Sequence, residues 1–140
     1  MKQPSLIETA FFLKKVRLFA ELDLELLLAI AEKLHFDDYD ANELIFSPAQ
    51  PANRMYLIYK GSVQLIDAQG RAVSDLHPTD SFGDEALFSE LPRAYTAVAK
   101  SNSLFFTLSR SHLLSILSEC PSVALTLLQS YATSLPLRTQ

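Results

Sequence analysis

Apolar residues near the start of the chain recur at helical spacing. Ser5 and Glu8 have the spacing of a capping box, so a short helix is predicted from there to about Val16, with a frayed terminal segment as the alternative. Asp23 is a candidate N-cap for a second helix. Apolar residues follow it on one helical face, at Leu24, Leu27, Leu28, Ala31 and Leu34. We therefore expect an amphipathic helix over residues 24–34.

From about His35 to Ser109 the apolar segments become shorter, and β-branched and aromatic residues become frequent in them. Short strands are predicted at 43–47, 55–60, 62–67, 71–76, 95–100 and 104–108. Turn chemistry separates them: Asn42 suits a left-handed position, Gly70 suits a hairpin, and residues 77–80 read as a further turn. Strands this short and this closely spaced favour a sandwich or jelly-roll barrel over βαβ units.

The last third of the chain returns to helical spacing. One helix is expected to end near Glu119, because Pro121 disfavours helical geometry in the residue before it. Pro121 also suits the first position of a final helix, which Pro136 is expected to end. The apolar residues of that helix share one side: Val123, Ala124, Leu127, Leu128 and Tyr131. We expect a single domain over residues 1–140, with its core at about 18–131.

Composition and charge exclude several classes of function. The 140 residues carry a net charge of −4 and no large basic cluster, which argues against general nucleic-acid binding. No DNA-binding domain is expected, since the nine residues after Tyr131 are too few for a helix-turn-helix unit. Cys120 is the single cysteine, and no secretory or membrane-spanning run is visible, so a cytoplasmic protein is expected. The three histidines lie far apart in sequence, which argues against a metalloenzyme. We expect no enzymatic activity, no metal and no resident cofactor.

The segment from Phe82 to Thr96 carries the most informative chemical pattern. Gly83 follows a predicted strand end, a short helix is expected within 84–90, and Arg93 returns nine residues after Asp84. Backbone N–H groups at the start of a short helix and a guanidinium from the next strand can meet at one anion. The spacing therefore indicates an anion site built from one local segment.

In this order, the elements and the motif resemble the cyclic nucleotide-binding domain family, which includes the catabolite activator protein sensor domain and the regulatory subunits of protein kinase A. The resemblance covers about Leu18 to Tyr131. Residues 39–43 and 45–46 resemble the family's first two strands, 56–63 its central hairpin, and 82–94 its phosphate-binding cassette. It implies a mainly β fold: an eight-stranded, jelly-roll-like β-roll with N-terminal helices, a short cassette helix and two C-terminal helices.

The resemblance also implies roles for particular residues. Arg93 would pair with the cyclic phosphate, and the backbone of residues 83–86 and the N–H of Ala94 would complete that contact. Asp84 stands where a ribose-binding glutamate is expected. The candidate ligand-binding residues are Phe82, Gly83, Asp84, Glu85, Ala86, Arg93, Ala94, Tyr95 and Thr96. The candidate base wall is Val63, Leu65 and Leu76, with Tyr131 as a lid, although packing in the core or in a dimer is the alternative for Tyr131.

Four residues depart from the family's pattern. Asp84 is one methylene shorter than glutamate, and Ala49 replaces the usual glycine of the loop 47–52. Glu85 stands at a normally apolar position. If it faced the pocket, it would repel an anionic ligand at 4 Å by roughly 4 kcal/mol at an effective dielectric of 20. Tyr95 stands at a normally small position, where its ring either fills the nucleotide's space or faces the other side of the strand.

Two hypotheses follow for the function. The first is a sensor that binds a cyclic purine nucleotide and acts through movement of the C-terminal helices. Under this hypothesis cAMP is favoured over cGMP, because Ala94 offers no side-chain hydroxyl at the position where family members that prefer cGMP often carry threonine. The second is a ligand-free interaction module, in which Arg93 pairs with Asp84 or Glu85 and the last helix forms a homodimer. Both leave the protein partner unknown, and neither requires a membrane.

Overall fold

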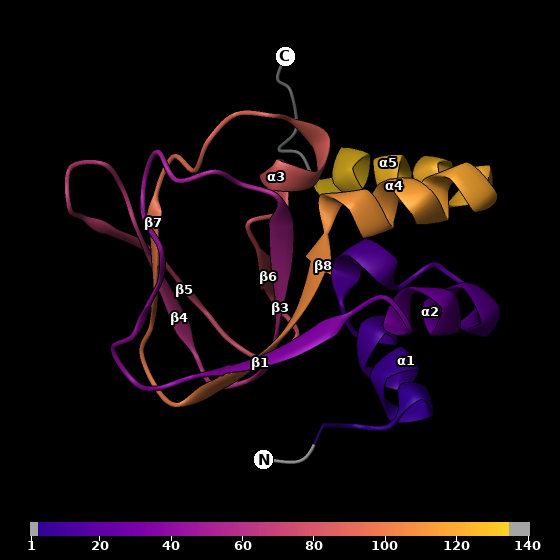
Figure 1. Ribbon diagram of the computed structural model, residues 1–140, viewed down its shortest axis with the longest axis horizontal. Helices are drawn as coiled ribbons and strands as arrows, with labels where there is room; N and C mark the ends of the chain where they lie inside the picture. Colours follow the sequence, from indigo (N-terminus) through magenta and orange to yellow (C-terminus); the bar gives the residue numbers. More distant parts are fainter. Residues whose placement is uncertain (1–2, 135–140) are drawn as a thin grey trace.

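A computed structural model describes residues 3–134 and shows a β-roll with helices gathered beside it (Figure 1). The helices are α1 (Leu6–Lys14), the 3-10 helix η1 (Arg17–Phe19), α2 (Leu24–Ala31), α3 (Glu85–Phe88), α4 (Arg110–Glu119) and α5 (Pro121–Ser134). The predicted start of the final helix at Pro121 is confirmed. Pro136 lies outside the described residues.

Within residues 3–134, eight strands form two antiparallel sheets. They are β1 (His35–Tyr39), β2 (Leu44–Phe46), β3 (Arg54–Lys60), β4 (Val63–Ile66), β5 (Ala72–Leu76), β6 (Ser81–Phe82), β7 (Thr96–Ala99) and β8 (Ser103–Ser109). One sheet has the order β1-β8-β3-β6 and the other has the order β2-β7-β4-β5. The predicted eight-stranded β-roll with flanking helices is therefore confirmed.

Local signals in the sequence account for several element boundaries. Ser5 closes the capping box of α1, because its hydroxyl accepts the Glu8 N–H at 3.2 Å while the Glu8 carboxylate accepts the Ser5 N–H at 2.9 Å. Asp23 caps α2 by accepting the Leu26 N–H at 3.0 Å. Asn42 adopts the expected left-handed backbone, with φ of 71°. Ala49 also has φ of 71°, so an alanine holds the conformation for which a glycine was expected.

The hydrophobic pattern missed two strands, β1 and β6, and the family resemblance placed the first of them too late in the chain. β1 pairs with β8 over its whole length, but its sequence is polar and does not alternate clearly. Residues 40–43, expected to continue the first strand, instead form the turn that follows it. β6 has only two residues, too few for a periodic signal, and its partners are Tyr56 and Leu57 of β3. α2 ends at Ala31, before the predicted Leu34, because the chain turns toward β1.

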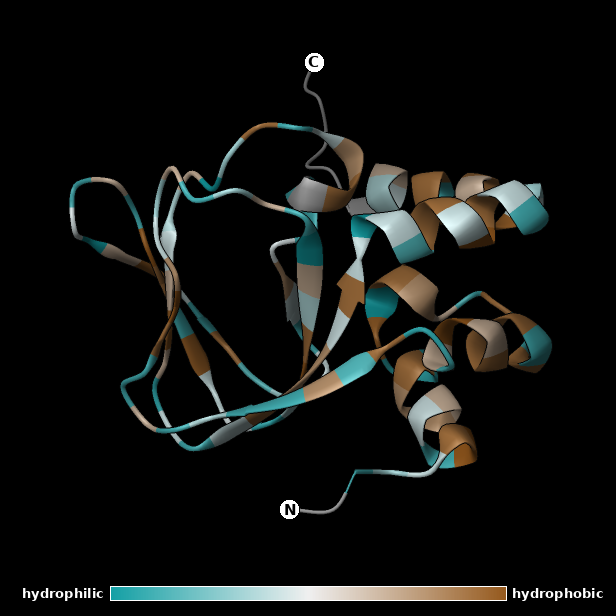
Figure 2. Cartoon of the chain, in the orientation of Figure 1, coloured by the Kyte–Doolittle hydropathy of each residue, from teal (hydrophilic) through white to brown (hydrophobic). Residues whose placement is uncertain are grey.

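Two hydrophobic clusters hold the domain together. The first joins the helices to the β3–β8 sheet through residues such as Phe19, Leu57, Phe106 and Leu127. Figure 2 shows the hydrophobic residues of these helices beside that sheet. The second cluster fills the roll with aromatic rings and small aliphatic side chains, and it places the cassette directly above a packed interior. Within residues 3–134 no single helix is long and apolar enough to cross a membrane, whereas α4 and α5 together, bent by 118°, pass on length and composition.

Candidate functional site

Arg93 is the centre of the candidate site, and its side chain is 2% exposed. The loop before β3 fixes its backbone. Its N–H donates to the Gln50 carbonyl at 3.0 Å, and its carbonyl accepts the Ala49 N–H at 2.8 Å. This pair of bonds explains why the loop 47–52 matters for the cassette: it determines where the arginine side chain begins.

The guanidinium of Arg93 is held from several sides. Nη1 donates to the Gly83 carbonyl at 3.0 Å, and Nη2 donates to the Arg54 carbonyl at 2.6 Å. The Glu85 carboxylate lies 3.6 Å from Nη1, and the Phe46 ring packs against the guanidinium at 4.1 Å. Nε has no hydrogen-bond partner among residues 3–134. Among the described residues, the Nε donor of a deeply buried cation is thus unsatisfied, whereas each terminal nitrogen has an acceptor.

Gly83 and Tyr95 form the second part of the site. Gly83 has φ of 74°, a left-handed conformation that favours glycine. Its N–H donates to the Tyr95 hydroxyl at 3.0 Å, and the Tyr95 ring lies inside the roll, 5.3 Å from the Phe46 ring. Burial and the nearby Glu85 carboxylate raise the pKa of Tyr95 above its usual range, so the hydroxyl stays protonated at neutral pH. The Tyr95 hydroxyl therefore accepts the hydrogen bond of one cassette backbone N–H, that of Gly83.

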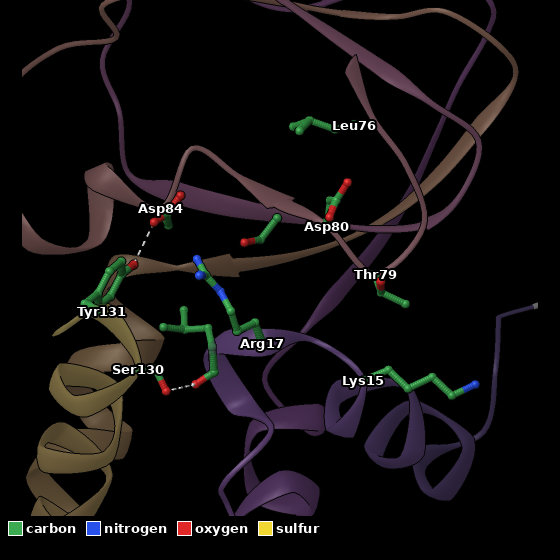
Figure 3. A pocket seen from close by; sticks show the side chains of 10 residues that line it. Lys15, Arg17, Leu76, Thr79, Asp80, Asp84, Ser130 and Tyr131 are labelled. Atoms are coloured by element: carbon green, nitrogen blue, oxygen red, sulfur yellow. Dashed lines mark hydrogen bonds between the residues drawn. The ribbon is translucent and has the colours of Figure 1, made fainter. Parts of the chain in front are cut away.

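Asp84 connects the cassette to the last helix. Its carboxylate accepts a hydrogen bond from the Tyr131 hydroxyl of α5 at 2.7 Å (Figure 3). The Tyr131 ring also meets the Phe88 ring edge-on at 5.5 Å. Burial and the Asp84 carboxylate raise the pKa of Tyr131 above its usual range. The expected ribose position is thus joined to the expected lid by a direct bond between the two side chains.

The structure places the other candidate residues as follows. Val63, Leu65 and Leu76 share the cluster inside the roll, and Val63 is fully buried there. Phe82 stacks on Tyr56 at 4.9 Å in the same cluster. Ala86 belongs to α3, Ala94 is exposed, and Thr96 begins β7 opposite Ile66.

Sequence reasoning missed two residues that hold Arg93. Arg54 contributes its carbonyl and not its side chain, so its residue type carries no signal for this contact. Phe46 was recognised only as part of a strand, although its ring forms the surface under the guanidinium. The sequence left open where the side chains of Glu85 and Tyr95 point. Glu85 faces Arg93, and the Tyr95 ring faces the inside of the roll.

The histidines and acidic side chains of the described residues do not form a metal centre. Within the described part of the chain, no group of three or more His, Cys, Asp and Glu side chains gathers around one point. His35 and His112, distant in sequence, stack at 6.2 Å, but two imidazoles alone do not form a tetrahedral site.

The geometry of the cassette agrees with a comparison to known protein families. The family model for the cyclic nucleotide-binding domain matches residues 36–120, which include β1 through α4 and the whole cassette. The chain belongs to the cyclic nucleotide-binding domain family. The resemblance predicted from the order of elements and from the Gly83–Arg93 spacing is confirmed.

Curated relatives in this family are much longer than the chain. The cAMP-dependent protein kinase regulatory subunit of Dictyostelium discoideum is 30% identical over 95 residues, covering 63% of this chain and 29% of that protein. Rap guanine nucleotide exchange factor 3 of Rattus norvegicus is 33% identical over 78 residues, covering 55% of this chain and 8% of that protein. The chain therefore spans less than a third of either relative.

Solved structures match over most of the chain. The N-terminal domain of a transcriptional regulator from Streptomyces coelicolor has a TM-score of 0.79 at 26% identity, covering 87% of this chain and 88% of that one. The sensor domain of the transcriptional regulator DNR from Pseudomonas aeruginosa has a TM-score of 0.76 at 24% identity, covering 92% and 94%. The regulatory domain of Toxoplasma gondii PKA, crystallised with cAMP, has a TM-score of 0.79 at 22% identity, covering 93% and 50%. The last two show the shared fold, and the family as a whole supports a regulatory or sensor role.

Proposed function

We propose that the chain is a non-enzymatic cytoplasmic sensor of cyclic purine nucleotides, with cAMP preferred over cGMP. The cyclic phosphate binds Arg93 and the Gly83 N–H after displacing Glu85 and the Tyr95 hydroxyl. The described structure then corresponds to the closed form of the cassette, and ligand binding opens it.

The observation that carries this proposal is the buried guanidinium of Arg93, whose Nε has no hydrogen-bond partner among the described residues. A buried donor without a partner costs about 1–3 kcal/mol, more for a charged group, so an anion that satisfies it gains that free energy. An arginine edge can also bind two oxygens of one phosphate. The family match covers the cassette and therefore favours a cyclic phosphate as the anion that binds Arg93.

Glu85 is a weak competitor for this position. Its side chain is 48% exposed and lies 3.6 Å from Arg93, a partly solvated ion pair that is worth about 0–1 kcal/mol. Displacing it therefore costs at most roughly fivefold in affinity. The Tyr95 hydroxyl is the stronger obstacle to phosphate binding. Its ring packs inside the roll, so the hydroxyl can leave the Gly83 N–H only if the ring moves as well.

Movement of the last helix follows from the bond between Asp84 and Tyr131. A ribose hydroxyl that donates to Asp84 competes with the Tyr131 hydroxyl for the same carboxylate. Loss of that bond releases α5 from the cassette, which changes the surface that α5 presents to a partner. This is a population shift that the ligand drives through one exchanged hydrogen bond.

Calorimetric titration with cAMP and cGMP, up to millimolar concentration, tests the proposal. We expect weak binding to the unmodified chain and about tenfold tighter binding after Tyr95→Phe, which frees the Gly83 N–H and keeps the ring. Glu85→Gln should tighten binding up to fivefold. Glu90→Gln is the matched control, because Glu90 lies in the same segment but pairs with Arg110 at 3.2 Å. Arg93→Ala should abolish binding, and absence of binding to the unmodified, Tyr95→Phe and Glu85→Gln chains would reject the sensor.

A second candidate function is a ligand-free interaction module. It is favoured by a specific observation: both terminal nitrogens of Arg93 and the Gly83 N–H already have protein partners. In this case α5 would act as a constant docking or homodimerisation surface, with Leu125 and Leu128 exposed on it. The same titration separates the two functions, because an interaction module binds no nucleotide in any of the variants.

A further inference from the structure

A cavity with a volume of about 290 Å³ lies beside the cassette. It is bounded by η1, by the turn before β6 and by α5 (Figure 3). Arg93 is not among its lining residues, so it differs from the phosphate position proposed above. Its size is near the lower end of ligand pockets, which suits one small metabolite.

Arg17 points into this cavity from η1 (Figure 3). Its guanidinium forms no hydrogen bond or ion pair within residues 3–134. Five N–H donors in a planar fork are thus available to a carboxylate, for which arginine offers bidentate geometry. Lys15 lies at the rim with its ammonium directed away from Arg17 (Figure 3).

Two carboxylates, those of Asp80 and Asp84, also line the cavity (Figure 3). Asp84 accepts the Tyr131 hydroxyl at 2.7 Å, and Asp80 accepts the His77 N–H at 2.9 Å. A carboxylate can accept about four hydrogen bonds, so both retain capacity for a further donor. The charges of the four ionisable lining residues, Lys15, Arg17, Asp80 and Asp84, sum to zero.

We propose that this cavity binds a small zwitterion of the α-amino acid class. Its carboxylate pairs with Arg17, and its ammonium group lies between Asp80 and Asp84. A lining that carries charges of both signs and no net charge matches a ligand that carries both charges and no net charge. A phosphate lacks the cationic group, and it would meet the repulsion of both carboxylates. The hydroxyls of Thr79, Ser81 and Ser130 favour a small or polar side chain, such as that of glycine or serine.

Binding here is coupled to the last helix. Asp84 and Tyr131 both line the cavity, and the ligand joins η1, the β6 end of the sheet and α5 in one network. An ammonium group on Asp84 adds a charge-assisted hydrogen bond to a carboxylate that already holds α5. The zwitterion therefore stabilises the docked position of α5, the opposite of the effect proposed for a cyclic nucleotide.

The test is calorimetric titration of the chain with glycine and with L-serine at millimolar concentration. Acetate and methylammonium each present half of the zwitterion, and inorganic phosphate presents an anion alone. We expect measurable binding of at least one amino acid, at least tenfold tighter than acetate, methylammonium or phosphate. Absence of amino acid binding overturns the proposal, and binding of phosphate or acetate with equal affinity overturns the ligand class.

Variants locate the site. Arg17→Ala and Asp80→Asn should each weaken amino acid binding at least tenfold, and Asp80→Asn keeps an oxygen for the His77 N–H. Arg71→Ala is the matched control, because Arg71 is an exposed arginine that pairs with Asp67 in the hairpin after β4. Unchanged affinity in Arg17→Ala overturns the assignment. Amino acid binding that persists in Arg93→Ala distinguishes this site from the nucleotide site.

Discussion

At Gly83, a side chain would collide with the guanidinium that the glycine carbonyl binds. A Cβ there would lie 2.8 Å from Arg93 Nη1, whereas a Cβ at Gly70 would meet nothing within 4 Å. The two glycines have similar φ angles, 74° and 84°, so the backbone strain of an alanine is similar at both. A comparison of alanine substitutions at Gly83 and Gly70 therefore separates the effect of the Arg93 contact from the cost of the left-handed backbone.

We predict that Gly83→Ala destabilises the domain more than Gly70→Ala. The left-handed backbone costs about 1–2 kcal/mol for an alanine at either position. At Gly83 the displaced arginine also loses a hydrogen bond of a charged group, worth about 1.5–3 kcal/mol. Urea unfolding of the two variants measures the difference. Equal losses of unfolding free energy would show that Arg93 does not depend on Gly83.

At the scale of elements, Tyr131 links α5 to the cassette through its hydrogen bond to Asp84 and its ring contact with Phe88. Tyr131→Phe removes only the hydroxyl, and Asp84→Ala removes only the acceptor. We predict a coupling of about 1–2 kcal/mol between the two changes in a double-mutant cycle, and faster hydrogen exchange in α5 for either variant.

Ser130→Ala serves as the control for that cycle. Its hydroxyl is one residue away on α5, and its bond to the Leu18 carbonyl is 3.5 Å, at the limit of a hydrogen bond. It should cost little and show no coupling to Asp84→Ala. Additive effects of Tyr131→Phe and Asp84→Ala would mean that α5 is held by packing alone, which would remove the basis for the proposed helix movement.

The elements that the sequence predicted are those with local causes. The cap at Ser5, the turn at Asn42 and the break before Pro121 each depend on residues within a few positions of one another. The contact of Tyr95 with Gly83 spans twelve residues, and that of Tyr131 with Asp84 spans forty-seven. Both depend on how β7 and α5 dock onto the cassette, which no local pattern contains. The sequence therefore predicted the cassette's position but not the groups that occupy it.

At the scale of the whole molecule, the order of helices, short strands and helices was enough to predict the β-roll, because few folds combine them in this way. The filling of the roll was not predictable. Six aromatic rings meet there: Tyr39, Phe46, Tyr56, Phe82, Tyr95 and Phe105. Each is an ordinary strand residue in the sequence, and only closure of the two sheets brings them into one cluster. Because the tyrosines of that cluster are at least partly buried, we expect the stability of the domain to respond to alkaline pH.

Burial raises the pKa of Tyr39 to about 12, with Tyr56 and Asp37 adding to the effect, and burial also raises the pKa values of Tyr56, Tyr95 and Tyr131. Below about pH 10 these tyrosines are protonated in both states, so they leave the stability independent of pH. Above about pH 10 the unfolded chain loses protons that the folded chain retains, so the stability falls as pH rises toward the folded pKa values.

We predict that the free energy of unfolding of the chain declines between pH 10 and pH 12, by at most about 1.4 kcal/mol per pH unit for each of these tyrosines and less where solvent reaches the ring. Urea midpoints at half-unit pH intervals measure this slope. Tyr39→Phe removes one titrating group and should make the slope shallower in that window, while the lysines, present in both proteins, cancel in the comparison. An identical slope in Tyr39→Phe would mean that Tyr39 ionises as readily in the folded roll as in the unfolded chain, and hence that water reaches this side of the ring cluster.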